Sequence, residues 1–183
     1  IPASSRRTVL YAPTWEGDRA SMRYSSVESH GPALVRSLVA TGRHRVIYRP
    51  HPRTGIVLRT TRAAHDEVIR LLHEANKADA GAAHLVDTDG GFGWQLAASD
   101  VAVMDISAVA YDWLATAKPL LVTQPAEPRA RLPESGLVRE HGALPRGVRP
   151  RHPRAQRGAG RAHRPPRRGS RVDDSPRASA GRR

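Results

Sequence analysis

SDVAVMDISAVAYDWLATAKPLLV, residues 99–122, carries the pattern that decides the fold of this chain. An apolar run, VAVMD at 101–105, is followed by apolar residues at helical spacing: Val109, Ala110, Trp113, Leu114 and Ala117. A second apolar run, PLLVTQP at 119–125, comes directly after them. Two apolar runs joined by one short helix predict a pair of parallel strands with a crossover helix.

Three further apolar runs precede this unit: TVLYAP at 8–13, RVIYRP at 45–50 and HLVD at 84–87. Each run is continuous rather than alternating, which is typical of strands in a parallel sheet covered on both faces. Helical patterns separate the runs, one from Gly31 to Gly42 and another around 61–77. Strands that alternate with helices in this way predict a single Rossmann-like, doubly wound α/β domain.

The positive charge of the 183-residue chain lies mostly in its last third. Residues 1–125 hold 14 basic and 12 acidic side chains, whereas residues 126–183 hold 16 and 5. From residue 138 onward there is no aromatic residue, so this segment cannot bury enough apolar surface to offset its ordering entropy. We therefore predict a folded domain over 1–137 and a disordered Arg/Pro/Gly/Ala-rich tail over 138–183.

Two explanations fit the tail. The chain contains 28 Arg but only two Lys, which suggests a GC-rich gene, and GC-rich codons read out of frame give mostly Arg, Pro, Ala and Gly. We therefore interpret residues 138–183 as a frameshift product. The alternative is a basic arm that binds nucleic acid through charge. The tail lacks aromatic stacking partners and any recognisable motif, so we expect no specific nucleic-acid ligand.

Composition excludes several classes of chemistry. The chain has no Cys, which excludes a disulfide framework, a cysteine-based zinc site and a thiol nucleophile. No apolar stretch approaches the roughly 18 residues of a membrane span, and the N-terminus lacks the build of a signal peptide. Any contact with a membrane is therefore expected to be peripheral. Because the chain starts at Ile1, shortly before a strand, we expect it to be the later part of a longer protein.

The motif RPHPR at 49–53 is the sharpest candidate site. Ligands of open α/β sheets bind at the carboxyl ends of the strands, and this motif ends the second strand. Pro50 and Pro52 fix the backbone beside His51, while Arg49 and Arg53 make its surroundings electropositive. This setting favours a phosphate ligand, to which His51 could donate a hydrogen bond or a proton. The alternative is an ordinary loop histidine between solvated arginines.

Asp105 and Ser107 form a second candidate site, at the end of the fourth strand. Ser107 is a natural helix N-cap, and this structural role explains it fully. The same geometry could also hold a pyrophosphate on free N–H groups at the helix start, with Asp105 orienting the loop. Thr14, in the loop after the first strand, is a further candidate. Asp112, in the following helix, is either solvated or bonded to a sugar hydroxyl.

The remaining polar and aromatic residues receive structural interpretations. Asp87 and Asp89 resemble a paired-aspartate metal signature, but Asp and Gly after a strand usually form only a turn, so we predict no metal site. Two histidines of the second helix are expected to be surface residues: His65 and His73. The three tryptophans could stack on a base, but core packing is the expectation for each of them: Trp15, Trp94 and Trp113.

Three motifs in this order, VLYAPTWEG, RPHPR and SDVAVMDISAVAYDWLATAKPLLV, resemble the CDP-glycerol glycerophosphotransferases of teichoic-acid synthesis. The resemblance covers about residues 8–125. It implies the donor-binding C-terminal half of a two-Rossmann, GT-B type glycosyltransferase fold. It also implies a protein that acts peripherally at the cytoplasmic face of the cell membrane, with CDP-glycerol as donor, a polyol-phosphate or glycolipid acceptor, and no cofactor.

The resemblance also implies roles for individual residues. His51 would lie at the donor pyrophosphate and be needed for activity, and Asp105 and Ser107 would belong to the loop that binds the phosphates. Ala108 departs from the family pattern, which usually has a second Ser there. The half of the family fold that carries the acceptor site has no counterpart in this sequence. We therefore expect a nucleotide-donor-binding domain over 1–137 that is inactive alone.

Two other readings of the chain remain. The same fold could use a UDP- or GDP-sugar, as related glycosyltransferases and sugar epimerases do. A basic nucleic-acid-binding protein with a Rossmann-like anchor is the non-enzyme alternative, and it requires steeply salt-dependent DNA binding that disappears when the tail is removed.

Overall fold

The structure is a computed structural model that describes residues 5–130 of the chain. Its centre is a sheet of five parallel strands in the order β3-β2-β1-β4-β5. The strands have these bounds: β1 Arg7–Ala12, β2 His44–Tyr48, β3 Leu85–Val86, β4 Val101–Met104 and β5 Leu120–Val122. All five lie within the apolar runs of the sequence or one residue before them. The predicted boundary after residue 137 and the tail over 138–183 lie outside the described residues.

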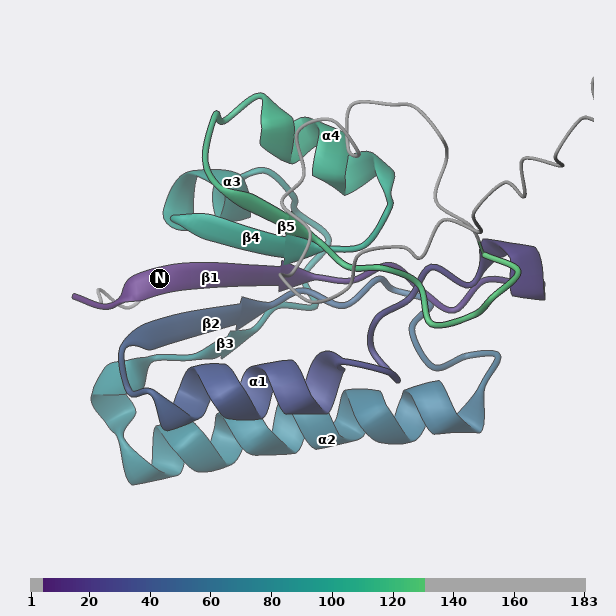
Figure 1. The fold of residues 1–183 in the computed structure, drawn as a ribbon. Helices are drawn as coiled ribbons and strands as arrows, with labels where there is room; N and C mark the ends of the chain where they lie inside the picture. The colour runs from purple at the N-terminus through teal and green to yellow at the C-terminus, as the bar shows by residue number, and fades with distance from the viewer. Residues whose placement is uncertain (1–4, 131–183) are drawn as a thin grey trace, which may run out of the picture. The chain divides into compact units, whose positions relative to one another are not determined.

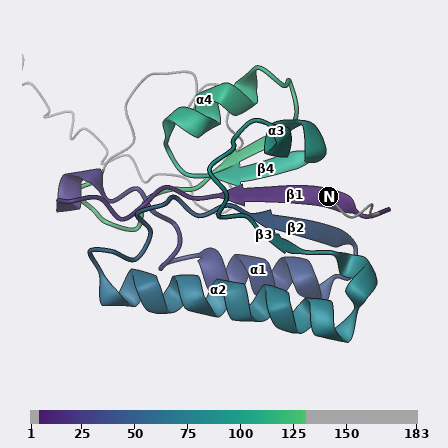
Figure 2. The same ribbon diagram turned by 180° about the vertical axis from the view of Figure 1, so that it is seen from behind.

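Helices cover both faces of the sheet, as Figure 1 and the reverse view in Figure 2 show. α1 and α2 pack side by side on one face, and α3 and α4 cover the other. The α-helices have these bounds: α1 Gly31–Ala40, α2 Arg59–Ala78, α3 Trp94–Ala98 and α4 Ala108–Leu114. Two short 3-10 turns, Ala20–Met22 and Ala80–Ala82, complete the elements. This arrangement confirms the predicted parallel, Rossmann-like α/β fold.

Each face of the sheet has its own apolar core, because successive side chains of a strand point to opposite faces. Val9 and Tyr11 of β1 pack toward the side of α1 and α2, where Val68 and Leu72 are fully buried. Leu10 and Ala12 pack toward α4, whose Trp113 is also fully buried. This alternation explains why the strand sequences are apolar throughout. Among the described residues no helix is long and apolar enough to cross a membrane.

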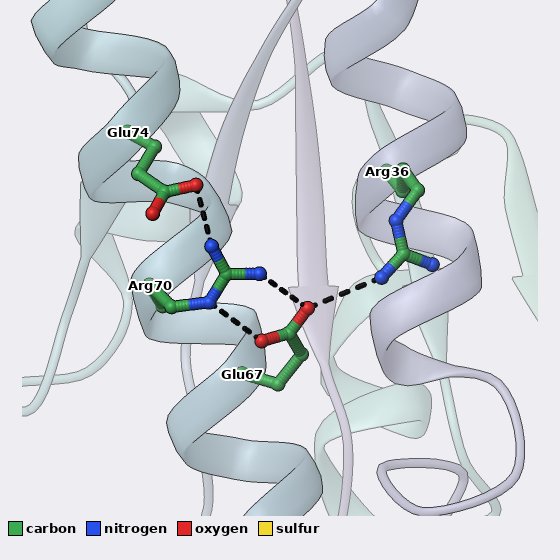
Figure 3. Close-up of polar contacts among 4 residues, drawn as sticks. All are labelled: Arg36, Glu67, Arg70 and Glu74. Atoms are coloured by element: carbon green, nitrogen blue, oxygen red, sulfur yellow. Dashed lines mark hydrogen bonds and ion pairs between the residues drawn. The ribbon is translucent and has the colours of Figure 1, made fainter.

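A network of ion pairs joins α1 to α2 on the surface (Figure 3). Glu67 of α2 lies 3.1 Å from Arg36 of α1 and 2.6 Å from Arg70, which in turn lies 2.6 Å from Glu74. The pairs within α2 have the three- and four-residue spacing that brings side chains together on a helix surface. Because most of these side chains are half exposed or more, we expect the network to contribute little to stability.

The face of the sheet that α3 and α4 cover departs from the sequence prediction in two places. Helix α3 is absent from the prediction, because it has only five residues, and its carbonyls are satisfied from far along the chain by Lys118. α4 ends at Leu114, so Ala117, which the sequence analysis placed on the apolar face of this helix, lies beyond its end and that prediction is wrong. Ala117 is exposed and has a φ of 54°, since the indole of Trp113 bonds to the carbonyls of Lys118 and Pro119 and turns the chain back.

Candidate functional site

The loops that follow β1, β2 and β4 meet at the carboxyl edge of the sheet. The strand order reverses at β1, which pairs with β2 on one side and with β4 on the other. The loops after β1 and β4 diverge at such a reversal and leave a crevice, where open α/β sheets bind ligands. The three predicted site motifs lie in these three loops.

One ring nitrogen of His51 accepts a hydrogen bond from the main chain. The main-chain N–H of Arg53 donates to Nδ1 of His51 at 3.1 Å. Since an N–H can only donate, Nδ1 carries no proton, and the neutral imidazole has its proton on Nε2. Partial burial and then the charge of Arg53 lower the pKa of His51, while Glu16 acts in the opposite direction. His51 is therefore a neutral donor through Nε2 near pH 7.

Trp15 supports both His51 and Arg53. Its ring stacks on the imidazole with centroids 6.1 Å apart, and the guanidinium of Arg53 lies 3.9 Å from the centre of its ring. Asp18 lies 3.4 Å from the same guanidinium. The expectation that Trp15 packs in the core is wrong, because it is half-buried in this stack. Trp113 is buried in the core, and Trp94 packs against it.

Glu16 fixes the loop that carries His51, a role that the sequence analysis missed. Its side chain is only 2% exposed and accepts hydrogen bonds from the main-chain N–H groups of Gly55, Val57 and Leu58, at 2.9, 2.8 and 3.2 Å. Burial opposes the ionisation of Glu16, but these donors outweigh it and lower its pKa. A lone acid directly after a strand in the TWEG motif was the available signal, and its partners lie about 40 residues away.

Arg49 is tied to the end of β3. Its Nη1 lies 2.8 Å from Oδ2 of Asp87 and donates to the main-chain oxygen of Asp89 at 2.8 Å. Asp87 also accepts from Gln95 at 2.6 Å, so it serves as an internal partner. Within residues 5–130 no group of three His, Cys, Asp or Glu side chains could hold a metal ion.

Asp105 connects the loops that border the crevice. Its fully buried carboxylate accepts from the main-chain N–H of Thr14 at 2.8 Å and of Ser26 at 3.0 Å, and it is bonded to the hydroxyl of Thr123. Burial raises the pKa of Asp105 despite these hydrogen bonds. Asp105 thus joins the loops after β1 and β4 and has no exposed surface for a ligand.

Ser107 occupies the N-cap position of α4 without capping it through its side chain. Its hydroxyl donates to the main-chain oxygen of Asp105 at 3.3 Å, so the expected hydrogen bond from a first-turn amide is not formed. Two lone pairs of the hydroxyl oxygen are left for other donors. Asp112 is exposed on α4 and lines none of the cavities described below.

Two cavities share His51 in their lining, together with Arg49, Pro50 and Pro52. The Ser107-side cavity, about 290 Å³, also contains these residues: Ala12, Pro13, Phe92, Ser107 and Val109. The helix-side cavity, about 330 Å³, also contains these residues: Thr54, Arg62, His65, Thr88, Asp89 and Gly90. The structure thus brings Arg49, His51 and Ser107 to one cavity, with Arg53 stacked beside it.

His65 differs from the expected surface histidine. It is half-buried, and its Nδ1 lies 2.9 Å from the hydroxyl of Tyr48, a buried residue of β2 beneath α2. The expectation is wrong because helix spacing alone does not show which strand residue lies below. His73, eight residues further along α2, is exposed as expected. A wider cavity of about 600 Å³ lies beyond Glu16, with Glu28, Thr60 and Thr61 among its lining residues.

Comparison with known proteins gives a family and a partial structural likeness. A family model described as CDP-Glycerol:Poly(glycerophosphate) glycerophosphotransferase matches residues 1–127. Among solved structures, the chain is similar to the ADP-heptose lps heptosyltransferase II of E. coli, with 16% identity and a TM-score of 0.42. That alignment covers 73% of this chain and 40% of the E. coli chain. No curated protein matches the chain significantly.

Proposed function

This chain belongs to the CDP-glycerol:poly(glycerophosphate) glycerophosphotransferase family, and from that premise we propose that its sheet binds CDP-glycerol as the donor of glycerol phosphate. The acceptor is a wall polymer or glycolipid that carries a free hydroxyl, and the reaction takes place at the cytoplasmic face of the membrane through peripheral contact. One observation carries the proposal. Arg49, His51 and Ser107, from two different loops, line one cavity next to the reversal of strand order.

The proposed reaction is phosphoryl transfer. The acceptor hydroxyl attacks the glycerol-bearing phosphorus, the bond from that phosphorus to the CMP oxygen breaks, and CMP leaves. Catalysis then consists mainly of positioning and of neutralising the charge that develops on phosphoryl oxygens. By resemblance to the family, the base that takes the hydroxyl proton belongs to the acceptor-binding half of the fold. The present chain alone is therefore proposed to bind donor without extending a polymer.

His51 is proposed to donate a hydrogen bond from Nε2 to the departing phosphate. The bond from the Arg53 N–H to Nδ1 supports this role over proton transfer, because a fully protonated ring would lose that bond. The lowered pKa of His51 supports the same choice. Trp15 acts as a positioning residue, since it contacts both the imidazole and the Arg53 guanidinium.

The phosphates are proposed to contact Arg53, Arg49 and Ser107. Arg53 is half-exposed, and its charge is only loosely matched by Asp18 at 3.4 Å. Arg49 contributes less charge, because Asp87 lies 2.8 Å away and the pair is largely buried. Asp105 and the main chain of Thr14 act from beneath, by holding the two loops at a fixed spacing. Arg53 lines none of the cavities but is included because it stacks on Trp15, which contacts His51. Asp112 also lines none of the cavities and is left out of this site.

Calorimetric titration of the chain tests the donor assignment. We expect CDP-glycerol and CMP to bind, and UDP-sugars to bind at least about tenfold more weakly. Ser107→Ala should weaken the binding of CDP-glycerol. Asp112→Asn, in the helix that Ser107 precedes, should leave this binding unchanged. If a UDP-sugar binds more tightly than CDP-glycerol, the chain uses a nucleotide-sugar donor and the proposal is wrong.

A further inference from the structure

We propose that the helix-side cavity is a second anion site, which binds a phosphate ester separately from the nucleotide proposed for the Ser107-side cavity. His51 and its two prolines line both cavities. The ligand class is a phosphate ester of a small polyol, such as the phosphate end of an acceptor chain. That identity rests on the proposed function, but the existence of the anion site does not.

Thr54 gives the first reason to expect a ligand in this cavity. It is only 5% exposed and lines the helix-side cavity, and its hydroxyl has no hydrogen-bond partner among the described residues. Buried hydroxyls are normally paired, because an unpaired one loses its bonds to water without replacement. The hydroxyl oxygen itself has almost no exposed surface, so a rotation about χ1 is needed to turn it toward the cavity, where it could donate to a phosphate oxygen.

His65 gives the second reason. The phenol of Tyr48 is fully buried, and burial raises its pKa far above the usual value, so the phenol stays protonated and can donate to Nδ1 of His65. That hydrogen bond leaves the proton of a neutral His65 on Nε2. The ring is also held against Tyr48, with centroids 5.7 Å apart. His65 therefore lines the cavity as a fixed imidazole that can donate through Nε2.

Arg62 supplies positive charge at the mouth of the cavity. Its side chain is 60% exposed, and its contact with Asp66 is a loose 3.4 Å ion pair. Gly55 holds the loop directly against this residue: its φ is +77°, and a Cβ there would lie 2.9 Å from Cα of Arg62. Only glycine fits this position without strain, so the loop and α2 are kept close together.

Two arginines and two neutral imidazoles line the cavity and favour an anion. Arg49 and His51 face it from the loop after β2, Arg62 and His65 face it from α2, and Asp89 is the acid among its lining residues. The main-chain oxygen of Asp89 is occupied by Arg49. About 330 Å³ is space for a phosphate with a few carbon atoms.

The test uses the full chain, with glycerol 3-phosphate and inorganic phosphate as probes, titrated with and without saturating CMP. Thr54→Val keeps the shape of the buried side chain, and Arg62→Gln changes an exposed one. We expect each to raise the dissociation constant for glycerol 3-phosphate by about tenfold or more and that for CMP by less than about twofold. Ser107→Ala should instead raise the dissociation constant for CMP and leave that for glycerol 3-phosphate nearly unchanged.

Arg36→Gln is the matched control, because it removes the same charge from α1 (Figure 3) and Arg36 lines neither cavity. If Arg36→Gln and Arg62→Gln lose the same affinity for glycerol 3-phosphate, the effect is one of general charge and the second site is overturned. The second site is also overturned if the wild-type chain does not bind glycerol 3-phosphate at millimolar concentrations, or if CMP displaces glycerol 3-phosphate. Thr54-dependent binding of phosphate without any binding of CMP or CDP-glycerol would refute the donor assignment alone.

Discussion

The loops after β4 and β2 use their charged side chains in opposite ways. Asp105, after β4, is fully buried and its carboxylate is saturated by donors from two other segments. His51 and Arg53, after β2, remain partly exposed and line or flank cavities. The buried acids of this edge therefore build the scaffold, whereas His51 and Arg53 are left for ligands. Glu16, buried beneath the loop after β2, obeys the same division.

The strongest test of this division is removal of the buried acid. Asp105→Ala leaves the N–H groups of Thr14 and Ser26 without a partner inside the protein. We expect the free energy of unfolding to fall by about 3 kcal/mol or more, measured by urea denaturation. Asp112→Ala, an exposed acid of the next helix, is the control and should change it little. Equal effects in the two variants would contradict the scaffold role of Asp105.

Substitution of an exposed base should leave stability intact and reduce activity. In an enzyme that pairs this sheet with an acceptor-binding half, His51→Ala should lower turnover about 10²-fold and affect donor affinity less. The unfolding midpoint should stay close to that of the wild type. An unchanged turnover number would show that His51 is an ordinary loop histidine.

Glu16 gives a pH-dependent version of the comparison. At pH 7, Glu16→Gln should destabilise the chain by about 2 kcal/mol, because charge-assisted hydrogen bonds to three N–H groups are weakened. The folded-state pKa of Glu16 is lowered, so its contribution is present above the unfolded pKa and lost as pH falls through the folded one. The two proteins should therefore converge in stability in acid, as followed by urea midpoints across pH.

The smallest expected effect concerns acids and bases that are both exposed. Arg36→Gln removes one ion pair of the network in Figure 3, and the urea midpoint should not change measurably at physiological salt. A low-salt measurement is the sharper version, since screening is weaker there. A large loss at high salt would mean that the network holds α1 in place, contrary to our interpretation.

The sequence predicted the sheet well because buried parallel strands are continuously apolar, a signal local to each strand. It predicted RPHPR and Asp105 as polar groups at strand ends by the same local reasoning. It missed the use of Glu16, Trp15 and His65, because each depends on a partner from another loop or strand. The five-residue α3 was missed for a similar reason: its carbonyl groups bond to Lys118, beyond the next strand and helix.

The stack of Trp15 on Arg53 and His51 gives the chain an optical reporter. Indole emission depends on neighbouring charge and on exposure to water, and Trp15 is the tryptophan in contact with the proposed phosphate-binding side chains. Trp113 is fully buried and Trp94 packs against the core, so their emission should remain nearly constant when a ligand arrives. Donor binding could therefore be followed by steady-state fluorescence without a label, and Trp15→Phe would identify the source of the signal.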